Sequence, residues 1–137
     1  MSEFRHLTTP IALPAGDVAS FAGNPANLPL WAEGLAGGIR AEGERWIASS
    51  PMGDVEVSFV GDLAEGILDH KVTLPTGATV LNQFRVLHDG PHSLAVFHLR
   101  REAGVTDEQF EADAAAVQRD LDTLRSVLEH GADGVVD

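Results

Sequence analysis

The chain has 137 residues, 44% of them hydrophobic and 22% charged, which is typical of a globular domain and excludes a disordered polypeptide. Its 21 acidic residues outnumber the 9 lysines and arginines, giving a formal net charge of −12. Because such a surface repels phosphate groups, we expect neither nucleic acid nor an anionic membrane as a partner.

The N-terminal sequence MSEFRHLTTPIAL lacks the basic region and apolar core of a secretory signal. No apolar run approaches the ~20 residues that a membrane-spanning helix needs. The absence of cysteine excludes disulfides and thiolate chemistry and suits a reducing compartment. These features predict a soluble cytoplasmic protein, and with no linker or repeat we expect one domain over residues 1–137.

The first element in chain order is a strand at Arg5–Leu13, followed by two short helices. Asp17 is placed to cap the first short helix, because its carboxylate can accept hydrogen bonds from free backbone amides. Pro25 and Pro29 interrupt the chain and limit the second short helix to the region of Leu28–Glu33.

Between residues 39 and 101 the chain consists of extended runs separated by turn residues such as glycine, proline and aspartate. Gly43, inside the first run, indicates a bulge. The connections are short enough for antiparallel hairpins. With the first strand this predicts six strands, or seven if one run breaks. The expected runs are Arg40–Ser49, Val55–Val60, Ile67–Leu74, Ala78–His88 and Ser93–Arg101.

A long helix is predicted at Asp107–His130. Thr106 and Gln109 have the spacing of a capping box, in which each side chain bonds the backbone amide of the other residue. Gly131 is expected just beyond the helix end. An apolar stripe at helical spacing must cover another element. Its members are Phe110, Ala114, Val117, Leu121, Leu124 and Leu128.

Alternation along the strands indicates which side chains face the interior, because successive residues of a strand point to opposite sides. His70 points inward, since the charged residues Asp69 and Lys71 share the other face. The same pattern turns Asn82, Phe84 and Phe97 inward, so the inner surface is mostly apolar with two polar exceptions.

The segment Phe21–Ala32, FAGNPANLPLWA, resembles the helical insert of the START-like, or SRPBCC, superfamily, although the commoner form has Asp where Asn24 stands. That superfamily includes polyketide cyclase/dehydrase-like proteins and Bet v 1-type ligand carriers. Gly66–His70 and Asp120–Leu124 are similar to uncharacterised bacterial members. The resemblance implies an α+β helix-grip fold. In it, a curved antiparallel sheet of six to seven strands wraps around the long C-terminal helix, with two short helices after the first strand.

The resemblance and the apolar inner faces predict that a hydrophobic or aromatic small molecule binds between the C-terminal helix and the sheet. The alternatives are a polyketide cyclase/dehydratase-like enzyme and a protein-interaction module without a small ligand. A homodimer through a sheet edge also stays open. The expected ligand contacts are Trp46, His70, Asn82, Phe84, Phe97, Val117 and Leu121.

His70 is the only candidate for a catalytic group, as a general base near neutral pH. The competing interpretation is a buried histidine whose hydrogen bonds go to a neighbouring carbonyl or to Asn82. Trp31 is expected to anchor the short helices onto the sheet, and the alternative is that its ring lines the mouth of a pocket. His88 and His92 flank a turn, but their spacing matches no established metal site, so we expect no metal and no cofactor.

Overall fold

The computed structural model describes residues 3–132, which form one antiparallel sheet and its covering helices. The order across the sheet is β1-β7-β6-β5-β4-β3-β2, and every neighbouring pair is antiparallel. The strands are β1 (Phe4–Ile11), β2 (Ile39–Glu42), β3 (Arg45–Ser50), β4 (Gly53–Phe59), β5 (His70–Thr73), β6 (Thr79–Asp89) and β7 (His92–Arg100).

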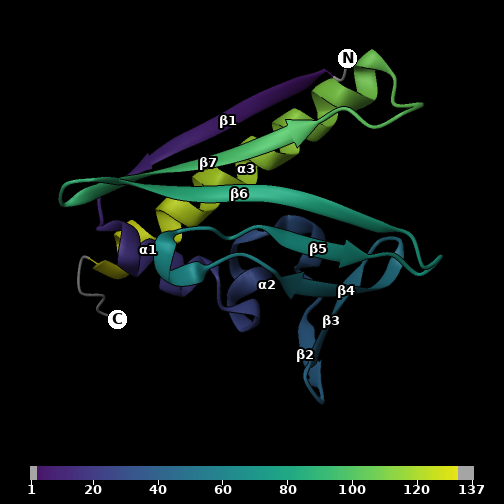
Figure 1. Ribbon diagram of the computed structural model, residues 1–137, viewed down its shortest axis with the longest axis horizontal. Coiled ribbons are helices and arrows are strands. Elements are labelled where there is room, and N and C mark those ends of the chain that lie inside the picture. Colours follow the sequence, from purple (N-terminus) through teal and green to yellow (C-terminus); the bar gives the residue numbers. More distant parts are fainter. Residues whose placement is uncertain (1–2, 133–137) are drawn as a thin grey trace.

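One long helix, α3 (Asp107–Ala132), lies along one face of this sheet, and two short helices follow β1. Figure 1 shows α3 crossing behind β7 and β6, while β2 and β3 bend away from the longer strands. The short helices are α1 (Ala15–Ala22), near the end of α3, and α2 (Leu28–Trp31), which packs on α3. This arrangement confirms the predicted α+β helix grip, with a long C-terminal helix held by an antiparallel sheet.

Two of the expected strands differ from the structure. The run at Arg40–Ser49 is not one bulged strand, because Gly43 adopts a φ of 65° and turns the chain into a hairpin between β2 and β3. The sheet therefore has seven strands. The run at Ile67–Leu74 is shorter than expected: β5 begins only at His70, after a 3₁₀ turn at Leu63–Glu65.

The helix ends show one confirmation and two corrections. The capping box before α3 is confirmed, with Gln109 N donating to Thr106 Oγ1 over 3.1 Å and Thr106 N donating to Gln109 Oε1 over 3.0 Å. The helix continues through Gly131, which is therefore not its terminating residue. Asp17 lies in the first turn of α1 and makes no capping hydrogen bond; Pro14 occupies the N-cap position instead.

The apolar stripe of α3 forms the core together with α1 and the inner sheet face, since Leu121 and Leu124 are almost fully buried. Residues 3–132 contain no helix that is both long enough and apolar enough to cross a membrane. The largest fully buried side chains are Phe84, Ile11, Leu68, Leu121, Leu124, Val18 and Ser93.

Candidate functional site

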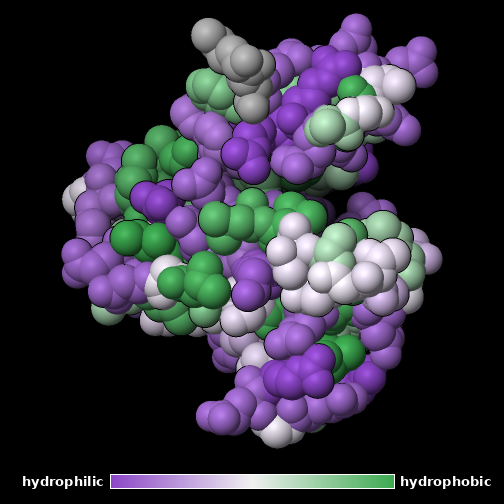
Figure 2. Space-filling view, turned by 45° about the vertical axis from the view of Figure 1, so that its right-hand side comes forward, coloured by the Kyte–Doolittle hydropathy of each residue, from purple (hydrophilic) through white to green (hydrophobic). Residues whose placement is uncertain are grey.

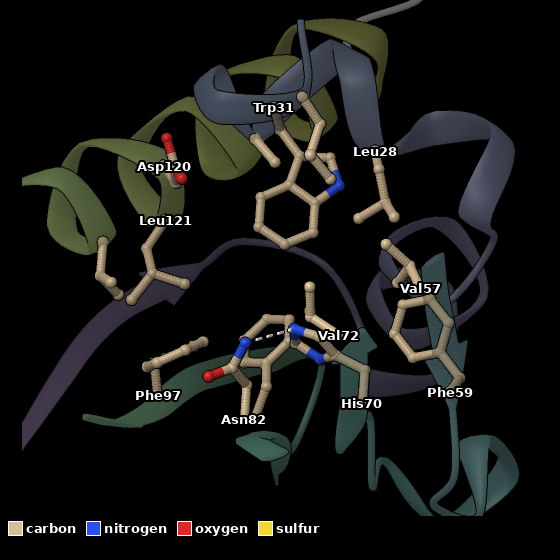
Figure 3. Close-up of a pocket in the computed structure, with 14 residues that line it drawn as sticks. Leu28, Trp31, Val57, Phe59, His70, Val72, Asn82, Phe97, Asp120 and Leu121 are labelled. Atoms are coloured by element: carbon tan, nitrogen blue, oxygen red, sulfur yellow. Dashed lines mark hydrogen bonds between the residues drawn. The ribbon is translucent and has the colours of Figure 1, made fainter. Parts of the chain in front are cut away.

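A cavity of about 260 Å³ lies between the middle of α3, the segment around α2 and the inner face of the sheet. Fourteen residues line it, and eleven of them are apolar. Figure 3 shows the helical wall, with Trp31 and Leu121, facing the sheet wall, with His70 and Asn82. An apolar concavity with few polar groups is the usual composition of a small-molecule site.

Six of the seven residues that the sequence singles out as ligand contacts lie around this cavity. Strand alternation brings four of them from the sheet, and the stripe of α3 brings the other two. They are His70, Asn82, Phe84, Phe97, Val117 and Leu121.

Trp46, the seventh predicted contact, does not line the cavity. It lies on β3 opposite Val57, half-buried, and borders a separate surface depression near Gly23, Pro25 and Leu63. The sequence left the face of Trp46 undecided, because Glu44 and Ala48 share it. Trp46 lies level with Val57, which lines the cavity, but β3 is one strand nearer the sheet edge than β4 and contributes no residue to the lining.

Eight other lining residues were not among the predicted ligand contacts. Val57, Phe59 and Val72 come from the neighbouring strands of the inner face, and their alternation was a usable signal. Asp120 lies on α3 outside the apolar stripe, so no periodicity pointed to it. The remaining four come from the segment around α2, namely Leu28, Trp31, Ala32 and Leu35.

Trp31 anchors the short helices, as expected, and also forms part of the cavity wall. Its side chain is buried and packs on Phe84, with the ring centroids 5.8 Å apart. Its indole N–H is buried and has no hydrogen-bond partner among the residues that the structure describes. In Figure 3 the six-membered ring faces the cavity while the nitrogen lies on the side toward Leu28. The helical wall of the cavity is therefore formed in part by the aromatic ring of Trp31, and not by its N–H group.

His70 begins β5 and faces the cavity between Phe59 and Phe97. Its Nδ1 lies 3.0 Å from the carbonyl oxygen of Leu68, and its Nε2 lies 3.4 Å from Nδ2 of Asn82. Burial lowers the pKa of His70 below its usual 6.5, although the Leu68 carbonyl and the Asp69 charge oppose this. The ring is therefore neutral at pH 7, and both of the partners suggested by the sequence are present.

The tautomer of His70 follows from these contacts. A carbonyl oxygen can only accept, so Nδ1 carries the hydrogen and Nε2 presents its lone pair. The amide group of Asn82 must then turn its NH₂ toward His70. The Asn82 oxygen is left on the other side, toward Phe97 in Figure 3.

Asp69 lies on the opposite face from the cavity, as alternation predicted, and it does not pair with the His70 ring. Its carboxylate accepts from Nε and Nη2 of Arg85 at 3.0 and 2.8 Å, and from the backbone N–H of Phe84 at 3.0 Å. These bonds lower the pKa of Asp69, with the Arg85 bond the largest cause. They also fix β5 against β6, and so hold His70 in position.

Asp120 is the acidic group at the cavity. Its Oδ1 accepts from the backbone N–H of Glu33 over 3.2 Å, which ties the segment after α2 to α3. Partial burial raises the pKa of Asp120, and the nearby Glu33 carboxylate adds to the effect, while the backbone hydrogen bond and the charge of Arg119 oppose it. Among residues 3–132, no three His, Asp or Glu side chains come together as a metal-ligand set.

No protein-family model matches the chain, and no curated protein matches it. Solved structures do match over nearly the whole chain. The protein XoxI from Bacillus cereus is 15% identical with a TM-score of 0.68, over 93% of this chain and 98% of that one. A START superfamily protein from Mycobacterium smegmatis is 12% identical with a TM-score of 0.68, over 93% and 97%.

The Zhui aromatase/cyclase from a Streptomyces species is 18% identical with a TM-score of 0.59, over 99% of this chain and 100% of that one. At these identities the likeness concerns the fold. The protein thus has the START-like, SRPBCC-type helix-grip fold, which the resemblance of Phe21–Ala32 had indicated.

Proposed function

We propose that the protein binds a small hydrophobic or aromatic molecule in the cavity between α3, α2 and the sheet. The observation that carries this proposal is the cavity itself, whose lining is apolar except for His70, Asn82 and Asp120. Filling such a space removes apolar ligand surface from water at about 25 cal/mol per Å². Apolar binding of this kind needs no metal or cofactor.

The size of the cavity limits the ligand. At about 260 Å³ it exceeds the ~150 Å³ apolar cavity that accommodates benzene. It is slightly smaller than the ~300–1,000 Å³ of drug-sized sites. A ligand with one or two rings, or a short branched chain, therefore fits better than a long acyl chain or a molecule of four fused rings.

The two tryptophans provide the test, because only Trp31 lines the cavity and Trp46 lies outside it. In ¹⁵N-labelled protein each indole N–H gives its own NMR signal, and Trp46→Phe assigns the two. Titration with naphthalene should shift the Trp31 signal and leave the Trp46 signal in place. No shift at Trp31, together with an unchanged melting temperature, would contradict the proposal.

The cyclase- or dehydratase-like alternative is favoured by one observation, the neutral His70 ring at the cavity wall. Its Nε2 contact with Asn82 is longer than the ~2.7–3.2 Å of a usual N–H hydrogen bond. A substrate proton could therefore replace that contact, with His70 as the general base. His70→Gln should then abolish turnover and leave ligand binding in place; surviving activity would exclude this role.

The interaction-module alternative needs one contiguous apolar surface. The exposed large hydrophobic residues instead belong to different elements, such as Phe4 on β1, Leu30 on α2 and Leu81 on β6. On the face drawn in Figure 2, hydrophobic groups are separated by hydrophilic ones. This distribution supports the small-ligand proposal better. The homodimer stays a prediction, for sedimentation analysis to test at the edge strands β1 and β2.

A further inference from the structure

The polar side chains that line the cavity include no cation. None of its fourteen lining residues is Lys or Arg, although the chain has nine of them. His70 and Asn82 stand on the sheet wall, and Asp120 stands on the helical wall across from them (Figure 3). The single group that carries a charge is therefore an acid.

The His70–Asn82 pair has a fixed hydrogen-bonding character. The Leu68 carbonyl holds the hydrogen on Nδ1 of His70, so Nε2 is an acceptor and takes an N–H of Asn82. The Asn82 oxygen is the second acceptor, and it has no partner among the residues that the structure describes. A ligand at this wall thus meets the Asn82 oxygen and the remaining N–H of the Asn82 amide, and it reaches the Nε2 lone pair only by replacing the 3.4 Å contact with Asn82.

A carboxylate on the ligand would meet unfavourable surroundings here. It would lose its hydration and gain no cationic partner from the lining residues, because the His70–Asn82 pair offers it only the remaining Asn82 N–H, while the Asn82 oxygen and Asp120 present electron pairs. A hydroxyl or N–H group could instead donate to the Asn82 oxygen or to Nε2. Protonation of His70 would supply a cation, but burial keeps that ring neutral at pH 7.

We propose that the cavity selects uncharged ligands that carry a hydroxyl or N–H donor on a compact apolar body, and that it discriminates against carboxylates of the same shape. The donor bonds to the His70–Asn82 pair, and the apolar body lies against Trp31, Phe97 and Val117. This inference rests on the proposed function, since it concerns the specificity of the same cavity.

Three probes of nearly equal shape test it, namely naphthalene, 2-naphthol and 2-naphthoate, with dissociation constants measured by calorimetry at neutral pH. One net hydrogen bond should make 2-naphthol bind about fivefold more tightly than naphthalene. The carboxylate should bind at least about tenfold more weakly than 2-naphthol, because it is buried without a partner. This ranking needs no variant, so it does not depend on the folding of a mutant.

Asn82→Leu combined with His70→Phe removes both acceptors and keeps the volume of the wall. In this variant 2-naphthol should lose its advantage, while naphthalene should bind as before. Trp46→Phe, outside the cavity, is the control and should keep the original ranking. Circular dichroism confirms that the variants are folded.

The outcomes separate the two proposals. If none of the three probes binds, both the proposed function and this selectivity are wrong. If naphthalene binds but 2-naphthol is no tighter, or 2-naphthoate binds equally well, the selectivity alone is wrong. The same holds if the double variant keeps the preference for 2-naphthol.

Discussion

The space beneath α3 is filled at one end and open in the middle. Toward the end of α3, where α1 packs, Val18, Leu68 and Leu124 have no exposed surface. In the middle, where α2 covers the sheet, Val72 and Val117 are only partly buried and border the cavity. Both regions use the same aliphatic and aromatic residue types, so composition does not explain the difference.

The covering elements explain it. The α1 helix has eight residues and buries four of them, including Val18 and Ala22. The α2 helix is a single turn of four residues, and Pro25–Asn27 and Glu33–Leu35 on either side are only 3₁₀ turns. The short α2 segment presents few side chains to the sheet. The volume between α2, α3 and the sheet that these side chains do not fill remains as the cavity. A packed core stabilises the fold, whereas a cavity is retained at a cost in packing.

The largest expected effect is at the packed end. Leu124→Ala should lower the free energy of unfolding by about 2–5 kcal/mol, because it leaves a void that the surroundings cannot fill. Val117→Ala, on the same helix, should cost less than half as much, since Val117 already borders open space. Urea unfolding of both variants tests this. Equal losses would mean that the two regions do not differ in packing.

In the second prediction, the same enlargement of a side chain changes stability in opposite directions at the packed end and in the open middle. Val18→Phe adds a ring where no space exists and should destabilise the protein by about 1–3 kcal/mol. Val117→Phe adds the same ring to the cavity and should raise stability by about 0.5–2 kcal/mol. It should also remove naphthalene binding. Thermal unfolding and calorimetry measure both effects, and destabilisation by Val117→Phe would contradict an open cavity.

Most of the fold was predictable because its signals are local and repeated. The stripe of α3 and the Thr106 capping box fixed the long helix, and turn residues separated the strands. The errors occur where one residue has two local interpretations. Gly43 suits a bulge or a hairpin, Gly131 suits a helix end or its interior, and Asp17 suits an N-cap or the first turn.

The cavity was predictable only in part, because alternation gives the face of a side chain and not its distance from the cavity. His70 and Asn82 were placed correctly by their face, whereas Trp46 stands on β3, from which no residue lines the cavity. Trp31 and Asp120 come to the cavity through the packing of the α2 segment on α3. That packing joins segments far apart in the chain, so no periodic pattern in the sequence predicts it.

The last prediction concerns the two walls of the open region, whose titratable groups have opposite effects on stability. Burial lowers the pKa of His70, so below about 6.5 the unfolded chain binds more protons than the folded protein. The contribution of His70 is therefore fully present above pH 6.5 and is lost as the pH falls toward the lowered pKa. His70→Phe should flatten the decline in unfolding free energy as the pH falls below about 6.5.

Asp120 changes stability with pH in the opposite direction to His70. Its pKa is raised above 3.8, so the folded protein keeps that proton to a higher pH than the unfolded chain does. Its contribution is lost as the pH rises through the window above 3.8, so ionised Asp120 destabilises the fold at pH 7. Asp120→Asn keeps an oxygen to accept from the Glu33 N–H and should stabilise the protein slightly at pH 7. The gain should vanish as the pH approaches 3.8. Urea unfolding across this range measures it, and a loss of stability at pH 7 would mean that the charge of Arg119 outweighs the burial of the Asp120 carboxylate.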